Sequence, residues 1–338
     1  MTSLKYFQEN APDYHIIAAG SLLGIAMHQG SSFPVGKVEF LDLYPLDFEE
    51  FLEVLNQKPL LALLRSQDWE LVKSFKSKFI HLLKTYYFVG GMPEAVLNYS
   101  IQQNLEKARE IQKRILESYD QDFMKHAPLE VVPRIRMVWN AIPAQLSKEN
   151  RKFIYGQIRQ GARAKDFEMA LNWLADCGLV HAVKRVNKAA IPLKSYEDLS
   201  AFKLFLLDIG LLGAMVDIDP KTILEGNRLF EEFKGATTEQ FVLQQLIATG
   251  LKPYYWSAEN ATAEVDFLVQ HQGDILPIEV KAEENLKSKS LKVFVEKFKT
   301  EKNIRTSMSP DFDTGTPKIK NRTFLPVFAD FRSTAGSF

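Results

Sequence analysis

The strongest constraint on the fold comes from two short runs of alternating residues that flank a Gln-Gly pair. Residues 264–269 read EVDFLV, residues 278–281 read IEVK, and Gln272 and Gly273 lie midway between the two runs. Alternation with period two is typical of strands whose two faces differ, and a two-residue loop containing Gly is typical of a tight hairpin. The pattern therefore predicts an antiparallel pair in which the numbers of opposed residues sum to 545.

On this register Asp266 lies opposite Glu279, Glu264 lies opposite Lys281, and all four share one face. The apolar residues of the first strand fall on the other face, toward the core: Val265, Phe267 and Val269. Carboxylates on opposed residues, whose Cβ atoms are about 4.5–5.5 Å apart, repel each other unless a cation lies between them. A divalent ion such as Mg²⁺ fits oxygen ligands of this kind, and a neighbouring lysine would position a phosphate. A solvated face of mixed charge is the alternative interpretation.

Composition narrows the class of protein. The chain has 338 residues, 46% of them hydrophobic and 25% charged, which predicts two or three globular domains and excludes a disordered or collagen-like chain. A single cysteine, Cys177, excludes a disulfide scaffold and indicates a reducing compartment. No apolar run reaches the ~18–20 residues that span a bilayer, and no signal peptide is present. We therefore expect a soluble, cytoplasmic protein with no membrane partner.

Two apolar runs near the N-terminus are typical of buried strands in a parallel α/β sheet. Residues 14–19 end at a Gly-Ser pair, and residues 38–44 stop at Pro45. Asp47 is then placed to cap a helix. Helices are predicted from residue 60 to residue 126, with one break at residues 90–93 (GGMP), since two glycines followed by proline cannot continue a helix.

The next segment has the pattern of a winged helix, which is two helices joined by a tight turn and followed by a hairpin. The predicted helices and strands are residues 149–160, 166–177, 179–186 and 191–196. Residues 131–195 contain twelve Lys and Arg against four Asp and Glu, a local net charge of +8 in a chain of net charge zero. Such a segment attracts polyanions, although a solvated helical surface is the alternative. The candidate nucleic-acid contacts are Arg159, Arg163, Lys165, Lys184 and Arg185.

After a boundary near residues 217–220, the predicted order is a helix (237–249), three strands, a helix (288–299) and a strand. Other motifs fail on spacing. The six histidines form no zinc-binding pair, and residues 30–38 space their glycines wrongly for a phosphate-binding loop. Residues 254–256 (YYW) are expected to pack in a strand rather than stack on bases.

Asp266, Glu279 and Lys281 resemble the D…(D/E)XK core of PD-(D/E)XK nucleases, and Glu239 matches the acidic residue often found on their first helix. Nearly end to end, the chain resembles a widespread prokaryotic family of AAA-type ATPases that end in such a nuclease-like domain. Five blocks carry this resemblance in the family's order: residues 17–23 (IAAGSLL), 43–51 (LYPLDFEEF), 90–94 (GGMPE), 205–212 (FLLDIGLL) and 264–267 (EVDF).

The resemblance implies that Ser21 is a sensor-1 residue facing the γ-phosphate of ATP. It also implies four parts: the C-terminal remnant of an AAA-type ATPase core (1–58), a helical lid (59–126), a winged-helix domain (127–218) and a three-layer, restriction-endonuclease-like α/β domain (219–338). The Walker A and Walker B motifs that the family places before the sensor strand are missing, so we expect no ATP hydrolysis by this chain alone. The chain is then a fragment, a truncated gene product, or a protein whose partner supplies an ATPase core. Assembly as a homo-oligomer is the alternative to such a partner.

We therefore expect an α/β multidomain protein that associates with DNA and has Mg²⁺-dependent phosphodiester hydrolysis as its candidate chemistry. By resemblance, Asp266 and Glu279 would ligate the metal with Glu239 assisting, and Lys281 would stabilise the attacking water and the scissile phosphate. No small-molecule substrate is implied. The alternative is a non-catalytic interaction protein that uses the winged helix and an inactive nuclease-like domain as docking surfaces.

Overall fold

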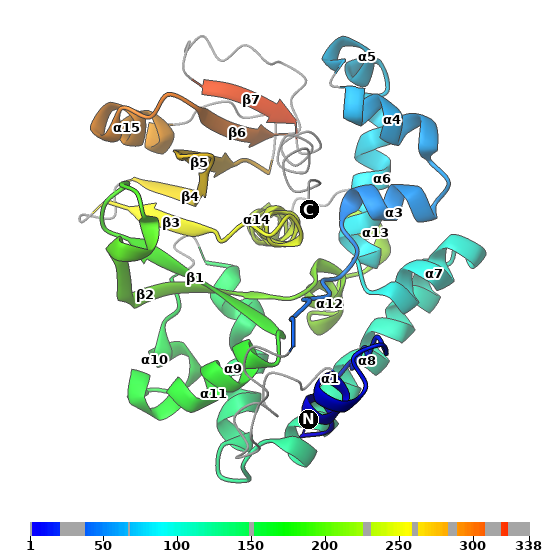
Figure 1. The fold of residues 1–338 in the computed structure, drawn as a ribbon. Coiled ribbons are helices and arrows are strands. Elements are labelled where there is room, and N and C mark those ends of the chain that lie inside the picture. Colours follow the sequence, from blue (N-terminus) through cyan, green and yellow to red (C-terminus); the bar gives the residue numbers. More distant parts are fainter. Residues whose placement is uncertain are drawn as a thin grey trace.

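The computed structural model of the chain describes residues 2–20, 38–66, 68–148, 152–225, 231–258, 263–282, 289–307 and 319–323. It is an α/β protein, as predicted, in which helices surround a mixed sheet (Figure 1). Within these residues no helix combines the length and the apolar character needed to cross a bilayer. The elements follow in this order: α1 (Thr2–Asn10), α3 (Phe48–Val54), α4 (Lys58–Ser66), α5 (Trp69–Ser74), α6 (Lys76–Val89), α7 (Pro93–Gln102), α8 (Leu105–His126), α9 (Val132–Leu146), α10 (Tyr155–Ile158), α11 (Ala164–Asp176), β1 (Val180–Val186), η1 (Leu193–Tyr196), β2 (Glu197–Leu206), α12 (Ile209–Met215), α13 (Pro220–Leu224), α14 (Glu231–Ala248), β3 (Tyr254–Ser257), β4 (Glu264–His271), β5 (Asp274–Val280), α15 (Lys289–Phe298), β6 (Asn303–Ser307) and β7 (Ile319–Thr323).

The region from α3 to α8 is helical, as predicted, but it has more breaks than the one expected, because helices also end at Ser66, Ser74 and Gln102. Asp47 caps α3 in a reciprocal capping box with Glu50, which satisfies the first backbone donors of that helix. The predicted break is confirmed, because α6 ends at Val89 and α7 begins at Pro93. Gly90, with φ 70°, ends α6 in a conformation that glycine adopts without strain.

A buried polar junction joins this helical region to α12 and α14. Asp208 caps α12, and its carboxylate also accepts hydrogen bonds from the Gly91 N–H (2.7 Å) and the Gln244 side-chain amide (3.0 Å). The Tyr86 hydroxyl donates to the Leu46 carbonyl (2.6 Å) and accepts from the same Gln244 amide (3.0 Å). The Leu46 N–H donates to the Gly91 carbonyl (2.8 Å). These five residues, called the Asp208 junction below, bring together segments that lie far apart in the sequence.

The secondary structure predicted for the winged-helix segment is wrong in part. The helix expected over residues 149–160 is reduced to α10 among the described residues, because residues 152–154 run extended. There the Phe153 N–H donates to the carbonyl of Phe202 on β2 (2.8 Å). The side-chain amide of Gln145 binds both backbone groups of Ile154 (2.9 Å each). Because of these contacts, the backbone of residues 153–154 makes its hydrogen bonds with residues of other elements and not within a helix. Tertiary contacts therefore override the helical pattern of the local sequence.

The hairpin is also displaced from its predicted position. Residues 191–196 were expected to form its second strand, but residues 193–196 form the 3₁₀ helix η1, and β1 pairs with β2 instead. Pro192 has no N–H to donate to a ladder, which disfavours a paired strand at that position. The helix predicted over residues 166–177 is confirmed as α11, and Gly178, with φ 70°, follows its end as expected.

The strands form one mixed sheet in the order β2-β1-β3-β4-β5-β6-β7. The elements predicted after residue 230 are confirmed in order as α14, β3, β4, β5, α15 and β6. β1 pairs in parallel with β3, so the β1–β2 hairpin extends the sheet of the C-terminal segment. Helices α14 and α15 lie on opposite sides of the strands (Figure 1), and each packs on its own apolar core.

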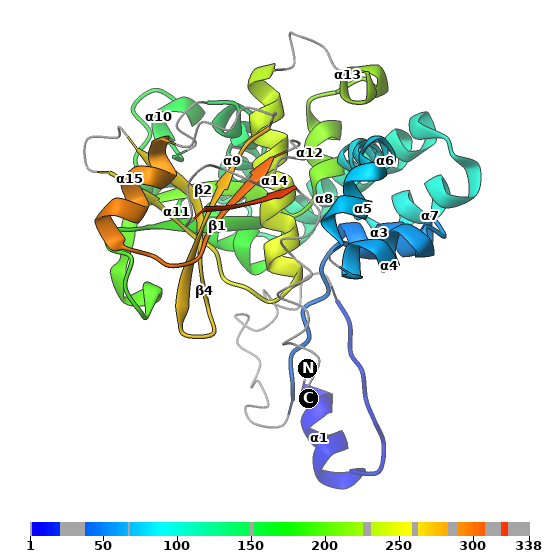
Figure 2. The ribbon, with the colours of Figure 1, turned by 90° about the horizontal axis from the view of Figure 1, so that it is seen from above.

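The two strands predicted near the N-terminus are not found. Residues 14–19 and 38–44 form no ladder with any described strand, and most of their apolar side chains are exposed, with Ile17 at 94% and Leu41 at 92%. In Figure 2, α1 stands apart from the other helices of the described chain. A buried parallel strand requires hydrogen-bonded neighbours and a covering layer, and the described residues supply neither to these segments.

Candidate functional site

The β4–β5 hairpin has the predicted register over the five residue pairs from Phe267–Ile278 to His271–Asp274, which do not include the predicted pairs Asp266–Glu279 and Glu264–Lys281. Opposed residues sum to 545 from the Phe267–Ile278 pair to the end of the hairpin. Both loop residues, Gln272 (φ 50°) and Gly273 (φ 81°), have the positive φ of a type I′ turn, whose twist matches that of the flanking strands. A two-residue loop is too short to allow the two strands to shift against each other, so the local sequence sets this register.

One part of the predicted strand pattern is wrong. Val265 pairs with Trp256 and Leu268 pairs with Tyr254, so β4 has one more residue than β3 in this interval. Such a bulge inverts the alternation of side chains beyond it. As a result Phe267 packs in the main core, whereas Val265 packs in the second core beside α15. The two residues do not share a face, contrary to expectation.

Three carboxylates converge on one fully buried ammonium group. The Lys203 Nζ atom lies 2.5 Å from Glu264 Oε1, 3.6 Å from Glu239 Oε2 and 4.0 Å from Asp266 Oδ1. It also lies 5.0 Å from the centroid of the Tyr255 ring, a distance typical of a cation–π contact. Lys203 comes from β2, Glu239 from α14 and the other two carboxylates from β4. These four charged residues are called the carboxylate–lysine cluster below.

The electrostatics of this cluster are dominated by burial. Burial raises the pKa of Asp266 well above its usual value, the negative charge of Glu239 raises it further, and the positive charge of Lys203 opposes the rise. Asp266 Oδ2 also accepts a hydrogen bond from the Val280 N–H (2.7 Å). The cation required between carboxylates packed this closely is therefore supplied by the protein itself.

The other two predicted site residues lie in a separate ion pair. Glu279 Oε1 is 2.7 Å from Lys281 Nζ. Arg305 of β6 lies across the ladder from Glu279 and is buried; burial lowers the pKa of Arg305, and the charge of Glu279 opposes that change. The structure thus brings Glu239 and Asp266 together and pairs Glu279 with Lys281, with the buried Arg305 across the ladder from Glu279. Among the described residues, no group of three or more His, Cys, Asp or Glu side chains is arranged to hold a metal ion.

Lys203 and Arg305 are the site residues that sequence reasoning missed. Lys203 lies inside the apolar run of residues 201–207 (AFKLFLL), where a single charged residue is the available signal. A lysine is almost never fully buried unless it is paired, so this position predicts a buried acidic partner. Nothing local identifies that partner, because β2 is separated from Glu264 by more than fifty residues of chain.

The five residues predicted to contact nucleic acid fall into two groups. Arg159, Arg163 and Lys165 are exposed, at the end of α10, in the turn and at the start of α11. Lys184 and Arg185 of β1 are half-buried and engaged within the protein. The Lys184 Nζ lies 4.8 Å from the centroid of the Phe202 ring, and Arg185 forms an ion pair with Asp198 (2.6 Å). The first three residues form the accessible basic group.

Ser21, the predicted sensor-1 residue, lies outside the described residues.

Family models match three parts of the chain. Residues 1–52 match an AAA domain, residues 80–222 match a domain of unknown function (DUF8612), and residues 234–326 match another domain of unknown function (DUF4143). No curated protein and no solved structure matches the chain significantly. Together, the AAA-domain match and the match at residues 234–326 support an AAA-type ATPase-like family for this chain.

Proposed function

We propose that this chain is an interaction protein of an AAA-type ATPase-like family, in which the carboxylate–lysine cluster has a structural role and does not hydrolyse phosphodiesters. The observation that carries this proposal is the position of the Lys203 ammonium group. It is fully buried and lies within 4.0 Å of the three carboxylates. This cation lies where a metal ion would otherwise bind the carboxylates, and it offsets part of their negative charge.

The residues present do not fit a Mg²⁺ site. Mg²⁺ requires oxygen ligands at about 2.0–2.1 Å in near-octahedral geometry. To reach Glu264 and Asp266, the ion would have to displace Lys203, whose Nζ atom is 2.5 Å from Glu264. Glu279, the second ligand expected under the nuclease hypothesis, is paired with Lys281 instead. These contacts favour the interaction-protein hypothesis over phosphodiester hydrolysis.

Calorimetric titration of Mg²⁺ and Mn²⁺ into the full chain tests this proposal. The wild-type protein is expected to show no saturable binding, because Lys203 competes for the carboxylates. Lys203→Met removes the ammonium group while keeping an unbranched side chain, and it is expected to bind Mn²⁺ saturably through the released carboxylates. The control is the double variant Asp266→Ala, Glu279→Ala. Saturable binding by the wild type that disappears in this double variant, with cleavage of DNA, would contradict the proposal and support a nuclease.

Association with DNA is a second candidate function, and the exposed basic group supports it. Arg159, Arg163 and Lys165 lie close together in sequence around one turn, within a segment of local net charge +8. Arginine and lysine side chains on one surface bind phosphates without reading sequence, and the affinity then falls steeply as salt rises. We expect duplex DNA to bind this surface through its phosphates.

Fluorescence anisotropy with a labelled DNA duplex at several salt concentrations measures this binding. Replacing Arg159, Arg163 and Lys165 together with alanine is expected to reduce the slope of log affinity against log salt by up to about 3. A triple variant that removes three exposed charges elsewhere is the matched control: Lys107→Ala, Lys113→Ala and Lys302→Ala. Equal losses in the two triple variants, or no binding by the wild type, would exclude a specific phosphate-binding surface at α10–α11.

A further inference from the structure

Helix α14 carries polar side chains that are buried and bind other elements along its length. Glu239 belongs to the carboxylate–lysine cluster, and Gln244 belongs to the Asp208 junction. The side-chain amide of Gln240 binds both backbone groups of Leu206 on β2, accepting from its N–H (3.0 Å) and donating to its carbonyl (2.6 Å). The contacts of Glu239 and Gln240 fix α14 against β2, and those of Gln244 fix it against Asp208 and Tyr86.

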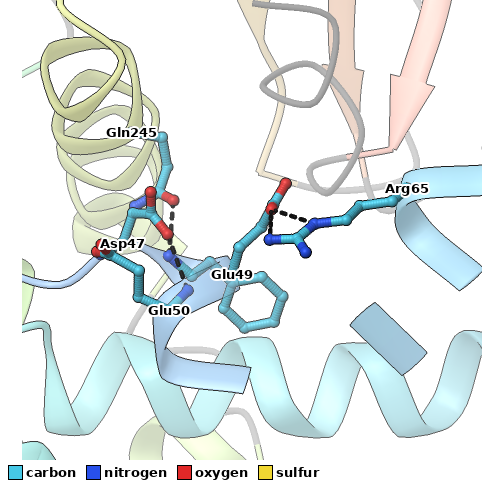
Figure 3. A network of polar contacts seen from close by, with 6 residues as sticks. Asp47, Glu49, Glu50, Arg65 and Gln245 are labelled. Atoms are coloured by element: carbon cyan, nitrogen blue, oxygen red, sulfur yellow. Dashed lines mark hydrogen bonds and ion pairs between the residues drawn. The ribbon is translucent and has the colours of Figure 1, made fainter. Parts of the chain in front are cut away.

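Gln245 extends this set of contacts to the N-terminal segment. Its Oε1 atom accepts a hydrogen bond from the N–H of Phe48, the first residue of α3 (2.9 Å). Figure 3 shows Gln245 directed at the start of α3, beside the capping box that Asp47 forms with Glu50. The amide of Gln245 also lies 3.3 Å from the Tyr86 hydroxyl, which holds the carbonyl of Leu46. The end of the segment that matches the AAA domain is therefore held on α14 by buried hydrogen bonds.

The same helix holds the carboxylate–lysine cluster from its other side. Gln245 and Glu239 are six residues apart, which is about 9 Å along a helix. Lys203 lies on β2 three residues before Leu206, which Gln240 clamps. Both the carboxylate of Glu239 and the strand that carries Lys203 are thus positioned by α14.

We propose that α14 couples the position of residues 46–48 to the charge balance of the carboxylate–lysine cluster. A displacement of the start of α3 moves Gln245 and with it the helix. The Glu239–Lys203 contact and the clamp on Leu206 then change together, because a packed helix moves as a unit rather than bending at one residue. Whatever binds or moves the segment that matches the AAA domain would thereby alter the cluster. This role is additional to the proposed function and does not depend on it.

Hydrogen exchange measured by mass spectrometry on the full chain tests this coupling. Gln245→Leu leaves the Phe48 N–H without its acceptor. Amide exchange is expected to become about fivefold faster or more in β2 and in the first half of β4, as well as around α3. The matched control is Gln112→Leu. Gln112 is also a fully buried glutamine whose amide binds two backbone carbonyls, those of Phe88 and Val89, but it lies on α8. The control should speed exchange at the end of α6 and leave β4 unchanged.

Two outcomes would overturn the proposal. One is faster exchange in Gln245→Leu that is confined to residues 46–54 and α6. The other is a uniform increase that includes α11, since that would report global destabilisation. If Gln245→Leu does not fold, Gln245→Asn keeps the amide but is one methylene shorter, and it replaces the first variant. A double-mutant cycle with Lys203→Met gives a second measurement, in which coupling predicts non-additive changes in unfolding and independence predicts additive ones.

Discussion

Asp208→Ala is expected to lower the free energy of unfolding by about 3–5 kcal/mol. The carboxylate accepts hydrogen bonds from the N–H groups of Gly91 and Leu211 and from the Gln244 amide, at 2.7–3.0 Å. Alanine would leave all three donors buried without that acceptor, and each such donor costs about 1–3 kcal/mol. Burial raises the pKa of Asp208, so removal of a desolvated charge offsets part of this loss.

Urea unfolding followed by circular dichroism measures the change, with Asp219→Ala as the matched control. Asp219 caps α13 as Asp208 caps α12, but its side chain is exposed, so water can replace it. The control should cost about 1 kcal/mol or less, the usual worth of an exposed N-cap. Equal effects of the two variants would mean that the Asp208 junction contributes no more than a helix cap.

Gly91→Ala is expected to be at least as damaging, with a loss of about 4 kcal/mol or no stable fold. A Cβ atom at this position would lie 2.1 Å from the Leu46 carbonyl oxygen and 2.9 Å from the Leu46 nitrogen. These are backbone atoms that cannot rotate away. Moving Leu46 would break its hydrogen bonds to Gly91 (2.8 Å) and to the Tyr86 hydroxyl (2.6 Å).

The matched control for this substitution is Gly178→Ala, measured by the same urea unfolding. Gly178 has φ 70°, but a Cβ there would meet no atom within 4 Å. Its replacement costs only the strain of a left-handed backbone, about 1–2 kcal/mol. If Gly91→Ala were no worse than this control, the close approach of Leu46 would be flexible and the junction would tolerate a wider spacing.

Features set by neighbouring residues were predictable from the sequence. The loop at Gln272 and Gly273 fixed the hairpin register, Asp47 marked the start of α3, and the residues around Gly91 marked the break after α6. In each case the information lies within a few residues, where turn and capping chemistry leaves little choice.

Features set by distant residues were not predictable in the same way. Lys203 reaches its carboxylates because β2 joins the sheet beyond β1 and β3, a pairing with no local signature. The buried glutamines of α14, such as Gln240, bind backbone groups of other elements. A polar side chain normally predicts the exposed face of a helix, so this burial has no local signal. The bulge at Phe267 likewise depends on β3, which is fixed only when the strands pair.

The parallel pairing of β1 with β3 has a consequence for how the protein can be divided. The two strands belong to segments matched by different family models, residues 80–222 and 234–326. A recombinant piece that starts after residue 222 would present β3 as an open edge, a template for self-association and aggregation. It would also carry Glu239, Glu264 and Asp266 without Lys203. The two matched segments share one sheet, although each matches a separate domain model. A recombination event that moved one segment without the other would therefore break this sheet.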